Sequence, residues 1–184
     1  MCDLLFVLPE EHPPEERCTA RYAKHRNRPD DEGYVAFLTP AMEALQARLA
    51  APARVLDFGC GPEPVLAGML QERGFAVSRY DPLFFPAPRP EGPFDAITAT
   101  EVFEHFQSPG RDIAGVVDLL ARRGLLVVMT ELVRPGLELA SWWYLRDETH
   151  VAFYSERTFN WLARFFALER LHSDTRRLVV LRKR

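Results

Sequence analysis

The chain has 184 residues, the size of one domain with a sizeable core. Its hydrophobic fraction of 47% and charged fraction of 27% are those of an ordinary soluble globular protein. The net charge of −3, without a long basic run, argues against a nucleic-acid partner. Three cysteines without a Cys-x-x-Cys pair favour a reducing compartment. The opening apolar run, residues 4–8, is shorter than a signal-peptide core or a membrane span, so we expect a cytoplasmic protein without a membrane contact.

We expect residues 1–33 to form an N-terminal arm, because residues 9–33 are rich in Pro, Glu, Arg and Asp. One helical stretch is expected within the arm, near 15–24. The main domain is expected over 34–184. It begins with apolar residues at helical spacing as far as Ala50, which predicts an amphipathic helix that Pro52 ends.

Strands and helices alternate through the main domain. Strands are expected at 54–58, 75–80, 94–99, 125–129, 166–171 and 178–182. Helices are expected at 62–73, 111–122 and 156–166, and a short one between the third strand and residue 106. This alternation predicts an α/β, Rossmann-like fold with a mostly parallel central sheet and helices on both faces. The last two strands are too close for a crossover, which predicts an antiparallel C-terminal hairpin.

Two features after the first two strands indicate a ligand site. Gly59-Cys60-Gly61 follows a buried strand, where glycines let backbone approach a ligand, although such turns also occur for packing. Asp81 stands twenty residues after Gly61 and directly before Pro82. An acidic side chain there can accept hydrogen bonds from ribose hydroxyls, and the alternative is an aspartate that caps a turn.

Together these motifs resemble those of class I S-adenosylmethionine (SAM) dependent methyltransferases. Leu56–Gly61 resembles their SAM-binding signature, and residues 94–106 resemble the segment that approaches the methionine end of SAM. Residues 123–129 resemble the strand that follows. The motifs occur in the family's order over about 53–130, which is more specific than any one of them. Within this superfamily the chain resembles the ubiquinone-biosynthesis type, in a variant with a Glu-x-x-Glu-His run.

The resemblance implies SAM as cofactor and a set of residues that bind it. Asp57 would orient the amino group, the glycine turn would flank the methionine part, and Asp81 would hold the ribose. Thr100 and Glu101 would lie near the sulfonium. The full implied set is Tyr22, His25, Asp57, Gly59, Cys60, Gly61, Asp81, Pro82, Thr100 and Glu101.

The chain departs from the family pattern in two places of the core. Glu63 stands where the third glycine is usual, so the backbone approach is expected to be looser. The segment from Pro82 to Pro93 is too short for the usual helix and strand, so the adenine-contacting residue of that strand has no counterpart. One residue of Leu83–Phe85 is expected to cover the adenine, with core packing as the alternative.

The arm has three possible roles. Tyr22, His25 and Asn27 stand where related enzymes fold a lid over the cofactor, which would exclude water. The alternatives are a solvated arm, or the remnant of a zinc ribbon that Cys2 would represent.

A run of acids and histidines suggests a metal. Glu101, Glu104 and His105 have the spacing of one helical face, and His150 follows later. This run resembles the metal site of small-RNA 3′-end 2′-O-methyltransferases, which implies a divalent cation such as Mg²⁺, Mn²⁺ or Fe²⁺. The alternative is that Glu104 and His105 only cap and pack the turn.

We therefore expect methyl transfer from SAM to an O or N nucleophile of a small-molecule acceptor by in-line displacement. His105 or His150 would serve as base, and two aromatic groups, 142–144 and 153–154, would wall the acceptor pocket or belong to the core. A non-catalytic SAM-binding module and a metal-dependent RNA methyltransferase are alternatives. A dinucleotide oxidoreductase ranks lower, because Pro64 takes the place of its third glycine. The oligomeric state stays open.

Overall fold

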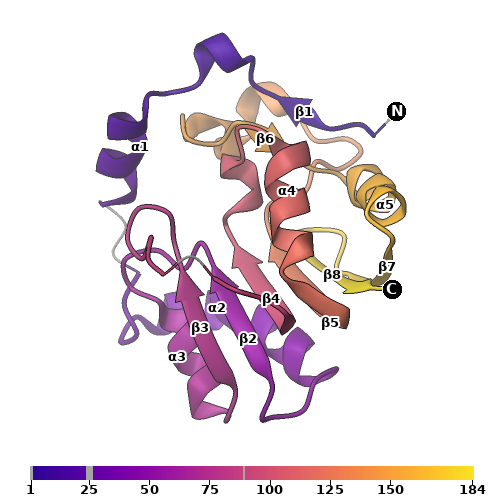
Figure 1. The fold of residues 1–184 in the computed structure, drawn as a ribbon. Coiled ribbons are helices and arrows are strands. Elements are labelled where there is room, and N and C mark those ends of the chain that lie inside the picture. Colours follow the sequence, from indigo (N-terminus) through magenta and orange to yellow (C-terminus); the bar gives the residue numbers. More distant parts are fainter. Residues whose placement is uncertain (1, 24–26, 89) are drawn as a thin grey trace.

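A computed structural model describes residues 2–23, 27–88 and 90–184. The described residues form a six-stranded sheet in the order β3-β2-β4-β5-β8-β7 (Figure 1). The strands are β2 (Arg54–Phe58), β3 (Ala76–Tyr80), β4 (Phe94–Thr100), β5 (Leu120–Met129), β7 (Leu168–Ser173) and β8 (Leu178–Lys183). The first four are parallel to one another, and β8 is antiparallel to both neighbours, β5 and β7. The predicted Rossmann-like sheet and its C-terminal hairpin are confirmed.

Helices cover both faces of this sheet. They are α2 (Glu32–Gln46) and α3 (Val65–Glu72) on one face, and α4 (Pro109–Asp118) and α5 (Glu156–Phe165) on the other. Consecutive residues of β2 show why both faces are apolar, since Val55 packs with α2 and α3 and Leu56 packs with α4 and α5. A strand buried on both faces reads as the continuous apolar run seen in the sequence.

Two predicted helices end earlier than expected. Helix α2 begins after Asp31, whose side chain accepts the backbone N–H of Gly33 and Tyr34, and it ends at Gln46 instead of Ala50. Helix α4 ends at Asp118, because Leu120 already pairs with Phe94 and belongs to β5. In both cases the helical spacing of apolar residues continues past the last helical residue. The apolar residues beyond that point lie in a loop or in a strand.

The connection from β3 to β4 is short and irregular, as predicted. Residues 82–88 and 90–93, the part that the structure describes, contain no helix or strand beyond a single bridge between Asp81 and Phe85. Strand β3 is therefore the edge of the sheet.

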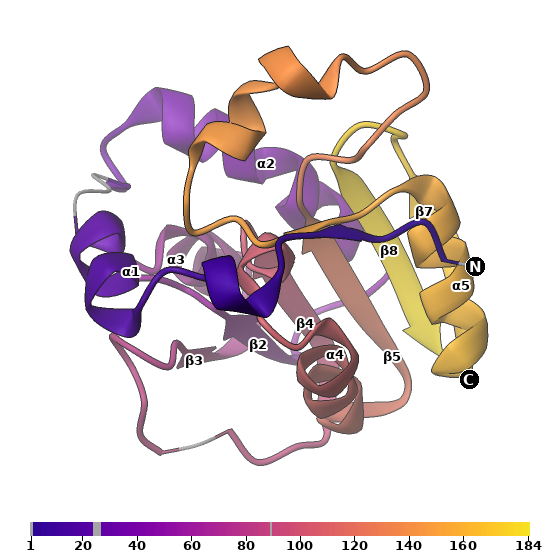
Figure 2. The ribbon, with the colours of Figure 1, turned by 90° about the horizontal axis from the view of Figure 1, so that it is seen from above.

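The N-terminal arm crosses the carboxyl ends of the strands (Figures 1 and 2). It holds β1 (Leu5–Phe6) and α1 (Glu15–Tyr22). Strand β1 pairs antiparallel with β6 (Ala152–Phe153), a contact that the sequence analysis did not anticipate. Four short 3-10 helices complete the described structure: Pro9–Glu11, Phe103–His105, Leu139–Ser141 and Trp143–Arg146. Among the described residues no helix is long and apolar enough to span a bilayer.

Candidate active site

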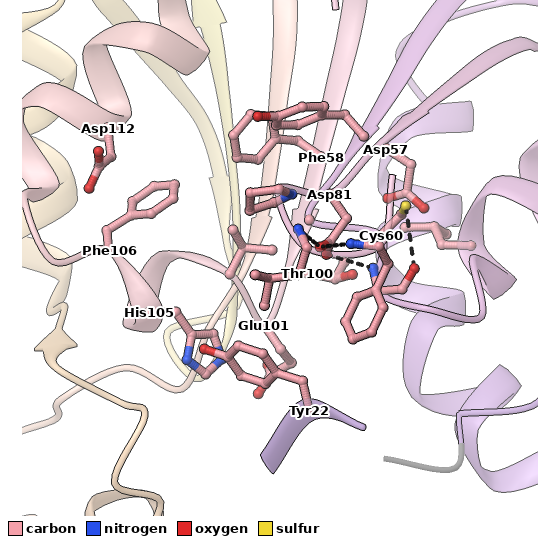
Figure 3. A pocket seen from close by; sticks show the side chains of 18 of the residues that line it. Tyr22, Asp57, Phe58, Cys60, Asp81, Thr100, Glu101, His105, Phe106 and Asp112 are labelled. Carbon is pink, nitrogen blue, oxygen red and sulfur yellow. Dashed lines mark hydrogen bonds between the residues drawn. The ribbon is translucent and has the colours of Figure 1, made fainter. Parts of the chain in front are cut away.

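A cavity of about 880 Å³ opens at the carboxyl ends of β2, β3 and β4, between α4, the arm and the segment 143–150 (Figure 3). This is where open α/β sheets bind ligands. The predicted site residues that line it are Tyr22, Asp57, Gly59, Cys60, Gly61, Asp81, Pro82, Thr100, Glu101, His105 and His150. Asn27 also lines it, whereas His25 lies outside the described residues.

The glycine turn after β2 has the left-handed backbone that glycine allows, with φ of +71° at Gly59 and +66° at Gly61. A Cβ atom at Gly59 would stand 2.4 Å from a methyl carbon of Val102, so this glycine is needed for packing. A Cβ atom at Gly61 would meet nothing within 4 Å. Glu63, in the place of the third glycine, is exposed and is not among the cavity-lining residues that the structure describes.

Asp81 caps its own turn and also reaches the glycine turn. Its Oδ1 accepts the backbone N–H of Leu83 at 2.9 Å and of Phe84 at 3.1 Å. Its Oδ2 accepts the N–H of Gly61 at 3.0 Å, and the residue is 8% exposed. The turn-capping alternative therefore describes part of its role, and Oδ2 keeps acceptor capacity toward the cavity.

Asp57 lies beneath this turn and is 2% exposed. Its carboxylate accepts the hydroxyl of Thr98 at 2.9 Å. Burial raises the pKa of Asp57 from an ordinary value of 3.8 to about 6, and the hydrogen bond from Thr98 opposes that rise.

Glu104, His105 and His150 offer ligand atoms within 4.8 Å of one another. The Nδ1–H of His105 donates to the carbonyl of Thr149 at 2.9 Å, and the Nδ1–H of His150 donates to the carbonyl of Tyr144 at 2.8 Å. A carbonyl can only accept, so Nε2 is the nitrogen of each ring that has a lone pair to offer in the neutral form.

Glu104 places Oε1 3.9 Å from Nε2 of His105 and is 0% exposed. Neither of its carboxylate oxygens accepts a hydrogen bond of normal geometry from the residues that the structure describes. The hydroxyls of Tyr144 and Thr130 lie close enough to lower its pKa, but burial outweighs them and the pKa is raised. A buried carboxylate in this state is a candidate ligand for a cation.

The expectation that Glu101, Glu104 and His105 share a helical face is wrong. Only Phe103–His105 is helical, a single 3-10 turn, and Glu101 precedes it with φ of +53°. Glu101 is therefore outside the cluster of potential metal ligands. Its carboxylate accepts the hydroxyl of Tyr144 at 3.2 Å and lines the cavity instead. Burial, reinforced by the charge of Glu104, raises its pKa well above the ordinary value.

The aromatic residues divide between cavity and core. Trp143 and Tyr144 line the cavity, and Trp143 is 59% exposed. Phe153 and Tyr154 are buried and are not among the lining residues in the described parts of the chain, so they belong to the core and not to a pocket wall. Tyr22, from α1, packs edge-on against His105 with ring centroids 5.1 Å apart.

Several lining residues were missed by the sequence analysis, namely Phe58, Tyr80, Phe106, Asp112, Gly115 and Leu119. Phe58 stands within the glycine signature and could have been inferred from it. Those of α4 carry no such signal, because an acid near a helix start and a glycine within the helix are common without a ligand.

A family model described as a methyltransferase domain matches residues 23–172. An O-methyltransferase family protein from Burkholderia thailandensis superposes with a TM-score of 0.61 and 14% identity, over 94% of this chain and 64% of that one. Magnesium protoporphyrin IX methyltransferase from Synechocystis PCC 6803, with bound SAH, superposes with a TM-score of 0.59 and 15% identity. The match covers 83% of this chain and 84% of that one.

The same fold also carries other chemistry. The 4+2 cyclase SpnF superposes with a TM-score of 0.53 and 16% identity, over 78% of this chain and 80% of that one. Such identities show the fold alone. The chain spans less than two thirds of several of the similar structures, such as the Burkholderia protein. No curated protein sequence matches the chain.

The family match is to methyltransferase domains in general, so the ubiquinone-biosynthesis subtype stays a prediction. The match covers most of the chain and includes the glycine turn, Asp81 and the cluster of Glu104 and the two histidines. The chain belongs to the methyltransferase-domain family, and its sheet has the Rossmann-like architecture expected from the sequence.

Proposed function

We propose that this chain transfers a methyl group from SAM to an O or N nucleophile of a small-molecule acceptor by in-line displacement. The observation that carries the proposal is that the left-handed turn of Gly59 and Gly61 and the side chain of Asp81 line one cavity, where the N–H of Gly61 donates to Asp81 Oδ2 at 3.0 Å. A volume of about 880 Å³ is near the upper end of the range of small-molecule sites, which suits a cofactor and an acceptor together.

The cofactor roles follow from the positions of the lining residues. Asp81 would accept a ribose hydroxyl through Oδ2, and Gly61 would leave open space for the methionine part. Asp57 would attract the amino group from below the turn. Thr100 and Glu101 would face the sulfonium, whose methyl group is already activated for attack.

At the other end of the cavity, Tyr22, Trp143 and Tyr144 would wall the acceptor. His150 would take the proton of the acceptor through Nε2. Burial lowers its pKa below 6.5, so the imidazole is neutral and ready to accept at neutral pH. His105 would be the second candidate for this step.

The arm would act as a lid over this acceptor end. Arg21 of α1 forms an ion pair with Asp147 at 2.7 Å, and Arg17 forms one with Glu148. Both acids lie in the segment that carries His150. A lid held in this way would exclude water from the reacting groups.

The test combines calorimetry with a methyl-transfer assay. Wild type should bind SAM, Asp81→Ala should bind it at least tenfold more weakly, and Asp118→Ala, at the exposed end of α4, should bind it like wild type. Equal binding by Asp81→Ala would refute the ribose assignment, and no binding by wild type would refute the function. Transfer of a labelled methyl group to a panel of phenols, amines and a 3′-terminal RNA hydroxyl separates an enzyme of small molecules from an RNA methyltransferase. Binding without any transfer would indicate a SAM-binding module.

A divalent cation at Glu104, His105 and His150 is a second proposal on the same site. It is an alternative to the base role of His150, because Nε2 would then bind the ion and could not accept a proton. The residues fit it, because a buried carboxylate without a hydrogen bond from the described residues faces two imidazoles whose Nδ1–H groups are held by carbonyls. The cation would lower the pKa of an acceptor hydroxyl. Metal content after incubation with Mn²⁺ should be near one per chain in wild type and in Glu101→Gln, and should fall in Glu104→Gln. Equal content in all three proteins, or none in wild type, would remove the metal.

A further inference from the structure

The cavity continues from the cofactor turn along α4, into a region that we call the α4 lobe. Its lining residues are Phe58, Leu83, Phe106, Asp112, Gly115 and Leu119. The lobe exists because the connection from β3 to β4 has no helix in its described residues. One face of the edge strand β3 is correspondingly uncovered, with Ala76 and Ser78 exposed.

The walls of the α4 lobe suit a flat aromatic ring. Phe58 packs with Tyr80 at 5.3 Å between ring centroids, and with Phe106 at 6.4 Å. These rings lie between the Asp81 side of the cavity and α4, as Figure 3 shows for Phe58 and Phe106. A planar base gains from stacking or edge contacts with such rings.

Asp112 adds a polar group to this apolar lobe. Its Oδ2 accepts the backbone N–H of Ser108 at 3.0 Å, which fixes the side chain at the start of α4. Its Oδ1 keeps its acceptor capacity, and the residue lines the cavity (Figure 3). A carboxylate only accepts hydrogen bonds, so it selects a ligand edge that carries an amino group over one that carries a carbonyl.

Gly115 leaves room in the lobe. It lies one helical turn after Asp112 and also lines the cavity, and a Cβ atom there would meet nothing within 4 Å. Gly68 of α3 offers the same open space but is not among the described lining residues. The two helical glycines therefore form a matched pair.

We propose that the adenine of SAM binds in the α4 lobe, in contact with Phe106 and with its amino group on Asp112. This inference rests on the proposed function. In it, α4 contacts the adenine in place of the strand that usually follows β3 in the family and that this chain lacks. The expected cover from Leu83 or Phe84 would come from the opposite wall, since both line the cavity. Phe85 is not among the described lining residues and packs under the guanidinium of Arg79.

The probes are SAH and its deaminated analogue S-inosylhomocysteine, which has a carbonyl in place of the adenine amino group. By calorimetry, wild type should bind SAH at least tenfold more tightly than the analogue, and Asp112→Asn should bring the two affinities within about threefold, because an amide can also donate. An unchanged preference in Asp112→Asn would overturn the role of Asp112.

Steric variants test the location separately. Gly115→Leu should weaken SAH binding at least tenfold, and Gly68→Leu should not. Phe106→Ala, which removes bulk, should also weaken it and guards against misfolding of the leucine variant. Wild-type affinity in both Gly115→Leu and Phe106→Ala would overturn the proposal while leaving the methyltransferase function intact. Absence of SAH binding in wild type would overturn both.

Discussion

At the scale of single residues, the two glycines of the cofactor turn differ in why a side chain is unfavourable there. Alanine at either position must adopt a left-handed backbone, which costs about 1–2 kcal/mol. At Gly59 the new methyl group would also collide with Val102, and such overpacking adds about 1–3 kcal/mol. We therefore expect Gly59→Ala to lose clearly more unfolding free energy in urea than Gly61→Ala. Gly61→Ala should instead lose SAM affinity.

A double-mutant cycle with Val102→Ala checks the cause. If the collision is responsible, Val102→Ala should restore part of the stability lost in Gly59→Ala and none of that lost in Gly61→Ala. Equal losses in the two single variants would contradict the packing role of Gly59.

Asp57 makes the stability of the fold depend on pH. Its folded pKa of about 6 lies above the ordinary 3.8, so between these values the folded state binds more protons than the unfolded state. Stability therefore falls as the pH rises through this window, by up to ~3 kcal/mol. Urea unfolding of wild type and Asp57→Asn at pH 4 and pH 7 measures this. The variant should lose less stability than wild type, and parallel losses would show that Asp57 is not the cause.

Residue types at the site were more predictable than their geometry. Asp57, Gly59 and Asp81 stand in a linear pattern that is legible in the sequence, and all of them line the cavity. The helical spacing of Glu101 and Glu104 was misleading, because the left-handed backbone of Glu101 keeps it out of the 3-10 turn that holds Glu104. Backbone conformation at one non-glycine position leaves no trace in the spacing of side chains.

At the scale of elements, α1 is held over the cavity mainly by polar contacts. Its described residues include no buried side chain, and the Arg21–Asp147 pair is partly exposed. Such pairs contribute at most about 1 kcal/mol, so Arg21→Ala should leave global stability nearly unchanged. It should nevertheless speed amide exchange in α1 and the dissociation of SAM. Hydrogen exchange and stopped-flow measurements test this.

Arg28→Ala is the matched control for Arg21. Arg28 also belongs to the arm and also pairs with an aspartate, Asp30, but both partners are largely exposed and neither is among the described residues that line the cavity. If the two variants change exchange in α1 equally, the pair with Asp147 is not what holds the lid.

The existence of each core element could be inferred from apolar periodicity, whereas its exact ends, and its partners outside the C-terminal hairpin, could not. Helix α4 stops at Asp118 because Leu120 is drawn into pairing with Phe94, a tertiary contact without a local signal. Likewise the apolar run at 4–8 could be recognised, but its partner β6 lies far along the chain. The proline-rich segment before Phe94 was correctly expected to lack a helix, since its composition excludes one locally.

At the scale of the whole molecule, cofactor binding should stabilise the native state. A ligand of the native state at 100 times its Kd adds about 2.7 kcal/mol. For a domain of this length each kcal/mol raises Tm by about 2–4 °C, so saturating SAM should raise it by roughly 5–10 °C. Thermal unfolding monitored by circular dichroism with and without SAM measures this. A Tm that does not move at millimolar SAM would contradict the cofactor assignment.

The pairing of β1 with β6 has a consequence for the order in which the molecule assembles. Leu5 can meet Phe153 only after the roughly 150 residues between them have been made, and closing so large a loop is entropically costly. The parallel strands β2 to β5 need no contact with the arm and can form before it docks. The cover of the cavity therefore joins after the parallel strands during synthesis, and it should be the first part to detach when the native protein opens locally.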